Sequence, residues 1–121
     1  MNEPRTSARE ISVEEFDEMI ENHDDLLIVD VREAGDFRRG HIPGALLLPH
    51  SLLEGAVDDT KRLQIEQLFG GRHKTFVLCS RDGSDSAAAA DRLRQLGVEK
   101  VYSLAGGIAG WQAQGCALVT D

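Results

Sequence analysis

Cysteine, aromatic residues and long apolar runs are all scarce in this chain. The two cysteines, Cys79 and Cys116, are too few for a disulfide scaffold and lack the clustered spacing of a zinc site. No run approaches the roughly 18 apolar residues of a transmembrane helix. The opening stretch, MNEPRTSARE, has no apolar core of a secretory signal. We therefore expect a cytoplasmic protein with free thiols and with no metal ion or other cofactor.

Positive charge is also in short supply. The chain has 13 basic against 21 acidic residues, a formal net charge of −8 at pH 7. A surface of this sign repels polyanions, so we expect neither nucleic acid nor a membrane as a partner. The length of 121 residues predicts one domain, with residues 1–9 as a flexible N-terminus and 10–121 as the folded part.

Short apolar segments alternate with amphipathic ones along the chain. Ser12 and Glu15 form a capping-box pattern, and the apolar stripe Ile11, Phe16, Met19 and Ile20 predicts a helix there. Strands are expected at residues 26–31, 45–48, 75–79 and 101–103. Further helices are expected at residues 33–39, 58–69, 86–97 and 107–114. Buried strands separated by helices predict an α/β protein with a parallel sheet covered on both faces.

The segment CSRDGSDS follows the third predicted strand, and ligands of parallel sheets bind beyond the carboxyl ends of the strands. Ser80, Gly83 and Ser84 can turn their backbone N–H groups inward as an anion-binding nest, and Ser86 is expected to cap the next helix. Cys79 would lie beneath these donors, which predicts a lowered thiol pKa. The alternative is that Cys79 is an inert, buried residue.

Two stretches carry a resemblance to a known family. LLIVDVREAGDFRRGHIPGALLLPH resembles the first signature of the rhodanese family, and VLCSRDGSDSAAAADRLRQLGVEKVYSLAGGIAGWQAQG resembles its active-site half. The two stretches stand in the family's order and spacing. The resemblance implies the rhodanese-like fold, an α/β fold with a five-stranded parallel sheet flanked by helices on both faces. It also implies a sulfurtransferase whose loop cysteine carries sulfane sulfur as a persulfide.

On this resemblance, Cys79 is the catalytic nucleophile. The implied substrate-binding residues are Arg32, Ser80, Arg81, Asp82, Gly83, Ser84 and Asp85. Asp30 is expected to order neighbouring loops through hydrogen bonds, while His41 and Trp111 are interpreted as structural residues. The implied partners are a small sulfur donor such as thiosulfate, a thiol or cyanide acceptor, and a sulfur-relay protein.

Two departures from the family's common loop leave alternatives open. That loop runs from the cysteine through a glycine three positions on to an arginine-serine pair, whereas Gly83 lies four positions after Cys79. The loop is thus one residue longer, and this spacing resembles that of relatives that handle phosphate, arsenate or selenium. However, Asp85 stands where those relatives carry an arginine, and together with Asp82 it repels an oxyanion. The alternatives are a weak or inactive interaction module with an acidic docking loop, or an arsenate reductase-like, phosphatase-like or selenium-handling variant.

Overall fold

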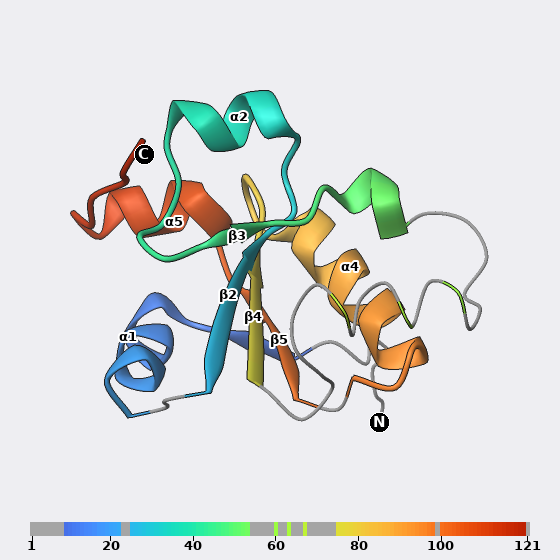
Figure 1. Ribbon diagram of the computed structural model, residues 1–121. Coiled ribbons are helices and arrows are strands. Elements are labelled where there is room, and N and C mark those ends of the chain that lie inside the picture. Colours follow the sequence, from blue (N-terminus) through green and yellow to red (C-terminus); the bar gives the residue numbers. More distant parts are fainter. Residues whose placement is uncertain are drawn as a thin grey trace.

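The computed structural model describes residues 9–22, 25–53, 60, 63, 67, 75–98 and 100–120. Within them, five strands form one parallel sheet in the order β1-β5-β4-β2-β3 (Figure 1). The strands are β1 (Arg9–Ile11), β2 (Leu26–Asp30), β3 (Leu46–Leu47), β4 (Thr75–Cys79) and β5 (Val101–Leu104). The helices are α1 (Val13–Asn22), α2 (Ala34–Arg39), the 3₁₀ helix η1 (His50–Leu53), α4 (Ser84–Gln95) and α5 (Gly107–Ala113). The predicted fold class is confirmed.

The side chains of β4 alternate between two cores, one on each face of the sheet. Phe76 and Leu78 join the core beneath α4, whereas Val77 and Cys79 join the core that contains Trp111 of α5. Figure 1 shows α4 on one side of the sheet and α1 and α5 on the other. All residues of β4 are buried, as expected for a central parallel strand covered on both faces. The alternation therefore directs the Cys79 side chain toward α1 and α5.

The first strand and the 3₁₀ helix η1 are the elements that the sequence analysis does not predict. Arg9, expected in the flexible N-terminus, begins β1, and Ile11 is a buried strand residue instead of part of a helical stripe. Three residues are too few to show the alternation that identifies a strand. The capping box is found as predicted, because the backbone nitrogen of Glu15 donates to Ser12 Oγ at 3.0 Å and that of Ser12 to Glu15 Oε1 at 2.8 Å.

The other predicted elements agree with the structure to within two residues, with one exception. The predicted helix at 58–69 lies outside the described residues apart from positions 60, 63 and 67. The helix predicted to open at Ser86 begins two residues earlier, at Ser84. Among the described residues, every helix is too short or too polar to cross a lipid bilayer.

Candidate functional site

The loop after β4 lies at the carboxyl edge of the sheet. β4 ends at Cys79 and α4 begins at Ser84, which leaves four residues, from Ser80 to Gly83, between them. Gly83 precedes the helix with a φ of 100°, a left-handed conformation that glycine adopts readily, and so allows the chain to enter α4 early. The loop therefore begins at Ser80 and reaches the first residue of α4 through Gly83.

Cys79 is fully buried, with a relative exposure of 0%. Its thiol donates a weak hydrogen bond to the carbonyl oxygen of Val29 at an Sγ–O distance of 3.7 Å. Burial, followed by the negative charge of Asp30, raises the pKa of the Cys79 thiol, and the positive charge of Arg32 opposes that rise. The predicted lowering of this pKa is wrong, because the thiol lies in the apolar core.

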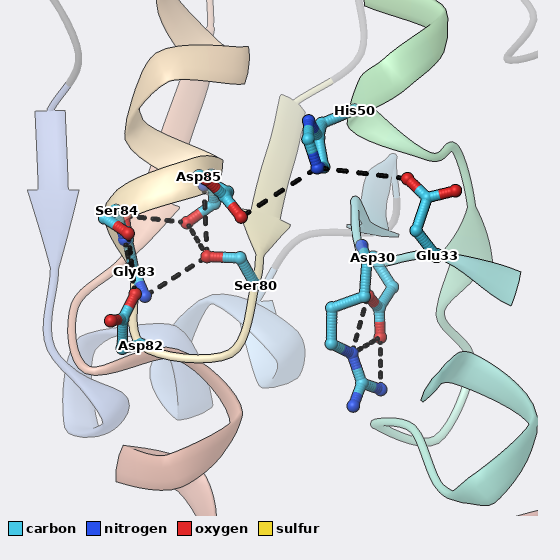
Figure 2. Close-up of polar contacts among 10 residues, drawn as sticks. Asp30, Glu33, His50, Ser80, Asp82, Gly83, Ser84 and Asp85 are labelled. Carbon is cyan, nitrogen blue, oxygen red and sulfur yellow. Dashed lines mark hydrogen bonds and ion pairs between the residues drawn. The ribbon is translucent and has the colours of Figure 1, made fainter. Parts of the chain in front are cut away.

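The N–H groups of the loop converge on Ser80 instead. The backbone nitrogens of Gly83 and Ser86 each lie 3.1 Å from Ser80 Oγ and donate to it. The Ser80 hydroxyl donates to Ser86 Oγ at 3.1 Å, and Ser86 Oγ lies 2.8 Å from Ser103 Oγ. Figure 2 shows the Ser80 side chain inside the curve of the loop. Of the predicted nest residues, Gly83 directs its N–H to Ser80 Oγ, whereas the N–H of Ser84 donates to Asp82 Oδ1. The two converging N–H groups, from Gly83 and Ser86, therefore meet at Ser80 and not at Cys79.

Ser86 differs from its predicted role as the cap of the helix. It lies within the first turn of α4, is fully buried, and donates its hydroxyl to the carbonyl oxygen of Gly83 at 3.1 Å. Ser80 is also buried, at 1% exposure. The three buried hydroxyls of Ser80, Ser86 and Ser103 thus form one hydrogen-bonded group beneath the loop. A fully satisfied group of this kind holds its backbone neighbours in place.

The closing helix α5 holds the loop from the other side. The backbone nitrogen of Ile108 donates to the carbonyl oxygen of Ser80 at 2.8 Å. The backbone nitrogen of Ala109 donates to the carbonyl oxygen of Arg81 at 3.0 Å. Gly107, with a φ of 60°, lets the two backbones approach, since a Cβ there would lie 2.8 Å from the Arg81 carbonyl oxygen. The position of the loop is therefore set by main-chain contacts.

Asp30 and Arg32 form a pair at the end of β2. Arg32 Nη2 lies 2.7 Å from Asp30 Oδ2, and Arg32 Nε lies 3.0 Å from Oδ1. The same Nη2 donates to the carbonyl oxygen of Gly40 at 2.6 Å, so the pair connects β2 with the end of α2. The hydrogen bond to Asp30 raises the pKa of Arg32 further. This arrangement fits the expectation that Asp30 orders neighbouring loops.

A hollow of about 220 Å³ opens beside the loop. Its lining residues are Arg32, Glu33, Asp36, His50, Arg81, Asp82, Ser84 and Asp85. Of the predicted substrate-binding residues, Ser80 and Gly83 are the two that do not line it. Sequence reasoning missed Glu33, Asp36 and His50, although each follows a predicted strand and so lies at the same edge of the sheet. No group of three metal-ligating side chains occurs among the described residues.

The acidic side chains of the loop point in different directions. The Asp85 carboxylate lies 4.0 Å from His50 Nε2, and that of Glu33 lies 3.9 Å from the same nitrogen (Figure 2). Asp82 Oδ1 accepts hydrogen bonds from the backbone and the hydroxyl of Ser84, which lower the pKa of Asp82. Asp82 and Asp85 both line the hollow, and their negative charges disfavour an anionic ligand there.

Comparison with known proteins identifies the family of this chain. The family model described as a rhodanese-like domain matches residues 12–114. The chain belongs to the rhodanese-like family. This rhodanese-like domain is 29% identical over 112 residues to a protein named sulfurtransferase from Allochromatium vinosum, covering 93% of this chain and 95% of that protein.

Two further comparisons bear on the extent of the domain. It is 30% identical over 99 residues to YibN of Escherichia coli K12, covering 81% of this chain but only 64% of YibN. The crystal structure of a rhodanese-related protein from Thermoplasma volcanium matches with a TM-score of 0.72 and 26% identity, covering 93% of this chain and 99% of that one. These matches confirm the predicted rhodanese-like fold.

Two residues interpreted as structural have structural contacts in this rhodanese-like domain. His41 is buried, with Nδ1 2.9 Å from the carbonyl oxygen of Phe37 and its ring stacked on that of Phe37 at 3.9 Å. Trp111 donates its Nε1–H to the carbonyl oxygen of Ala117 at 2.9 Å and packs against Phe16. Trp111 thereby connects α5 with α1, and His41 packs on the end of α2 that precedes it.

Proposed function

We propose that this rhodanese-like domain acts by binding a partner at its acidic loop face and does not carry sulfane sulfur on Cys79. The observation that carries the proposal is the direction of the Cys79 thiol, which lies in the apolar core and donates its hydrogen bond to Val29. A sulfur carrier of this kind needs a stabilised thiolate. Cys79 points away from the N–H groups of Gly83 and Ser86, which converge on Ser80 Oγ, and its raised pKa keeps the thiol protonated.

The charge of the loop face supports a positively charged partner. Four carboxylates line the hollow against two guanidinium groups, and one of these, that of Arg32, is already paired with Asp30. The overall charge of −8 has the same sign. A carboxylate 4 Å from a bound oxyanion costs on the order of 4 kcal/mol at an effective dielectric constant of about 20, whereas a cation gains a similar amount before screening. A basic segment of another protein therefore fits this face better than thiosulfate does.

Whether Cys79 accepts sulfur is tested by incubating the protein with thiosulfate and, separately, with 3-mercaptopyruvate. Peptide mass mapping then locates any gain of one sulfur atom. We expect none on Cys79, and we expect iodoacetamide to modify the half-buried Cys116 well before Cys79 in the folded protein. A sulfur adduct on Cys79 that disappears in Cys79→Ala would overturn the proposal.

Partner binding is tested with an arginine-rich peptide as the probe and a glutamate-rich peptide as its control. Backbone amide shifts should move around the loop with the first peptide only, and more weakly at high salt. A variant with Asp82→Asn and Asp85→Asn should lose most of this response. The matched control, Asp17→Asn with Glu21→Gln on the exposed side of α1, removes the same charge and should retain it. Equal responses from both variants would argue against a localised binding face.

A second candidate function is sulfur transfer through a persulfide on Cys79, with thiosulfate or a similar donor and a thiol, cyanide or relay-protein acceptor. The observation that favours it is the name sulfurtransferase carried by the relative from Allochromatium vinosum. It requires a local opening of the end of β4 that exposes the sulfur. The same mass-mapping experiment decides between the two functions.

A further inference from the structure

We propose that residue 80 is the position that decides whether this domain can carry sulfur, and that Ser80 leaves it unable to do so. This inference rests on the proposed function, since it gives the reason that the loop does not carry sulfur. It concerns the atom on which the backbone N–H groups converge. In this chain that atom is a hydroxyl oxygen.

The surroundings of Ser80 Oγ favour negative charge. Two backbone N–H groups, from Gly83 and Ser86, point at this one atom from 3.1 Å. It also lies beside the first turn of α4, a helix of 12 residues whose amino end carries partial positive charge. Charge-assisted hydrogen bonds of this type are about twice as strong as neutral ones. Ser80 is as buried as Cys79, so the two positions differ in these N–H donors and not in exposure. An ionised sulfur at position 80 would be stabilised by donors that Cys79 does not face.

A serine hydroxyl cannot use these surroundings for group transfer. It stays protonated at neutral pH, and serine becomes a nucleophile only when an adjacent base accepts its proton. In the described part of the chain, the partners of the Ser80 side chain are two backbone amides and the hydroxyl of Ser86. None of them is a base. The hydroxyl therefore occupies the nest as a neutral, fully hydrogen-bonded group.

The spacing of the loop supports the same position independently. Counted from Cys79, the glycine is displaced by one residue from the common pattern of cysteine, glycine three positions on, and an arginine-serine pair. Counted from Ser80, Gly83 is three positions on, and Asp85 and Ser86 take the places of the pair. The four-residue connection between β4 and α4 agrees with this count. The apparent insertion disappears when Ser80 is taken as the first residue of the loop.

The proposal predicts a gain of chemistry from the substitution Ser80→Cys in a Cys79→Ala background. The thiol introduced at position 80 should ionise below the ordinary thiol pKa of about 8.5, as followed by the ultraviolet absorbance of the thiolate. It should then attack the outer sulfur of thiosulfate. In that step the sulfur–sulfur bond of thiosulfate breaks, sulfite leaves with the electron pair, and a persulfide forms at position 80. Cyanide should remove the added sulfur as thiocyanate and restore the thiol.

Two comparison variants define the result. Cys79→Ala alone should gain no sulfur, and Ser80→Ala, also in the Cys79→Ala background, should report the cost of removing the acceptor of two N–H groups. Circular dichroism establishes that each variant is folded. A folded Ser80→Cys variant whose new thiol titrates no lower than an ordinary thiol, or gains no sulfur from either thiosulfate or 3-mercaptopyruvate, overturns the proposal. Sulfur on Cys79 of the unmodified chain would overturn both the proposed function and the claim that Ser80 leaves the domain unable to carry sulfur. Failure of Ser80→Cys with no sulfur on Cys79 would overturn the claim about residue 80 alone.

Discussion

Arg32 Nη2 bridges Asp30 Oδ2, at 2.7 Å, and the carbonyl oxygen of Gly40, at 2.6 Å. Asp30 is completely buried, so its carboxylate depends on this guanidinium for charge compensation. We expect Arg32→Ala to lower the free energy of unfolding by about 3 to 5 kcal/mol, because it leaves a buried charge without its partner. Urea denaturation measures the change.

A control for this variant is Arg39→Ala. Arg39 pairs with Asp36 at 3.4 Å, but its side chain is 84% exposed. Exposed ion pairs contribute about 0 to 1 kcal/mol to stability. The free energy of unfolding of this variant should therefore be close to that of the unmodified protein. Similar losses from both substitutions would mean that burial of Asp30 is not the cause.

The buried thiol of Cys79 predicts a dependence of stability on alkaline pH. Its folded-state pKa is raised by burial, so the unfolded chain releases the proton first as the pH rises. The contribution is fully present below the unfolded thiol pKa of about 8.5, and it falls by up to roughly 1.4 kcal/mol per pH unit above that value. Urea denaturation between about pH 7 and pH 10 should show this slope, and Cys79→Ala should lack it. Identical slopes in the two proteins would indicate a Cys79 that ionises freely in the folded state.

Gly107 and Gly35 provide a matched pair of glycine-to-alanine substitutions. At Gly107 a Cβ would collide with the carbonyl oxygen of Ser80 and lie 2.8 Å from that of Arg81, at a φ of 60°. Gly107→Ala should therefore destabilise the domain by about 2 to 4 kcal/mol, through overpacking and backbone strain. Gly35→Ala in α2 meets nothing within 4 Å and should stabilise it by about 0.5 to 1 kcal/mol. Thermal denaturation of both variants tests the contact between the loop and α5.

The hydrogen bonds from Ser84 to Asp82 predict a measurable titration shift. Backbone and hydroxyl donation from Ser84 lowers the pKa of Asp82, so this carboxylate favours the folded state above its ordinary pKa, and the effect is lost as the pH falls through the lowered value. Ser84→Ala removes one of the two donors and should raise the pKa of Asp82 part of the way back. Ser84→Thr keeps the hydroxyl donor and should leave the pKa of Asp82 lowered. Carbon-detected NMR titration of the Asp82 carboxyl distinguishes the two variants.

The sequence pattern was sufficient to predict the sheet, the whole of the central strand and the edge where the site lies, but not which side chain receives the loop N–H groups. β4 is buried on both faces along its whole length, so its apolar run does not show which core the Cys79 side chain enters. In the structure Cys79 points into the core that contains Trp111, and the N–H groups of Gly83 and Ser86 meet Ser80 Oγ. The sequence feature that identifies Ser80 as the first residue of the loop is its spacing from Gly83, which lies three positions later.

The start of α4 was misplaced for a related reason. Ser84, Asp85 and Ser86 are all residue types that favour the amino end of a helix, so composition alone does not choose among them. The choice is made by the left-handed backbone of Gly83 and by the burial of Ser86 against Ser103. Both are products of tertiary packing. The acidic lining from Glu33 and Asp36 was likewise not singled out, because it comes from a different strand end.

The main-chain contacts between the loop and α5 do not use the side chain at position 80. Serine and cysteine codons can differ by a single base, and their side chains differ by one atom. If residue 80 decides sulfur carriage as proposed, a domain of this architecture can exchange a carrier role for a binding role without insertion or deletion. Such an exchange would change the fold very little, so similarity of fold is a poor guide to which family members still handle sulfur.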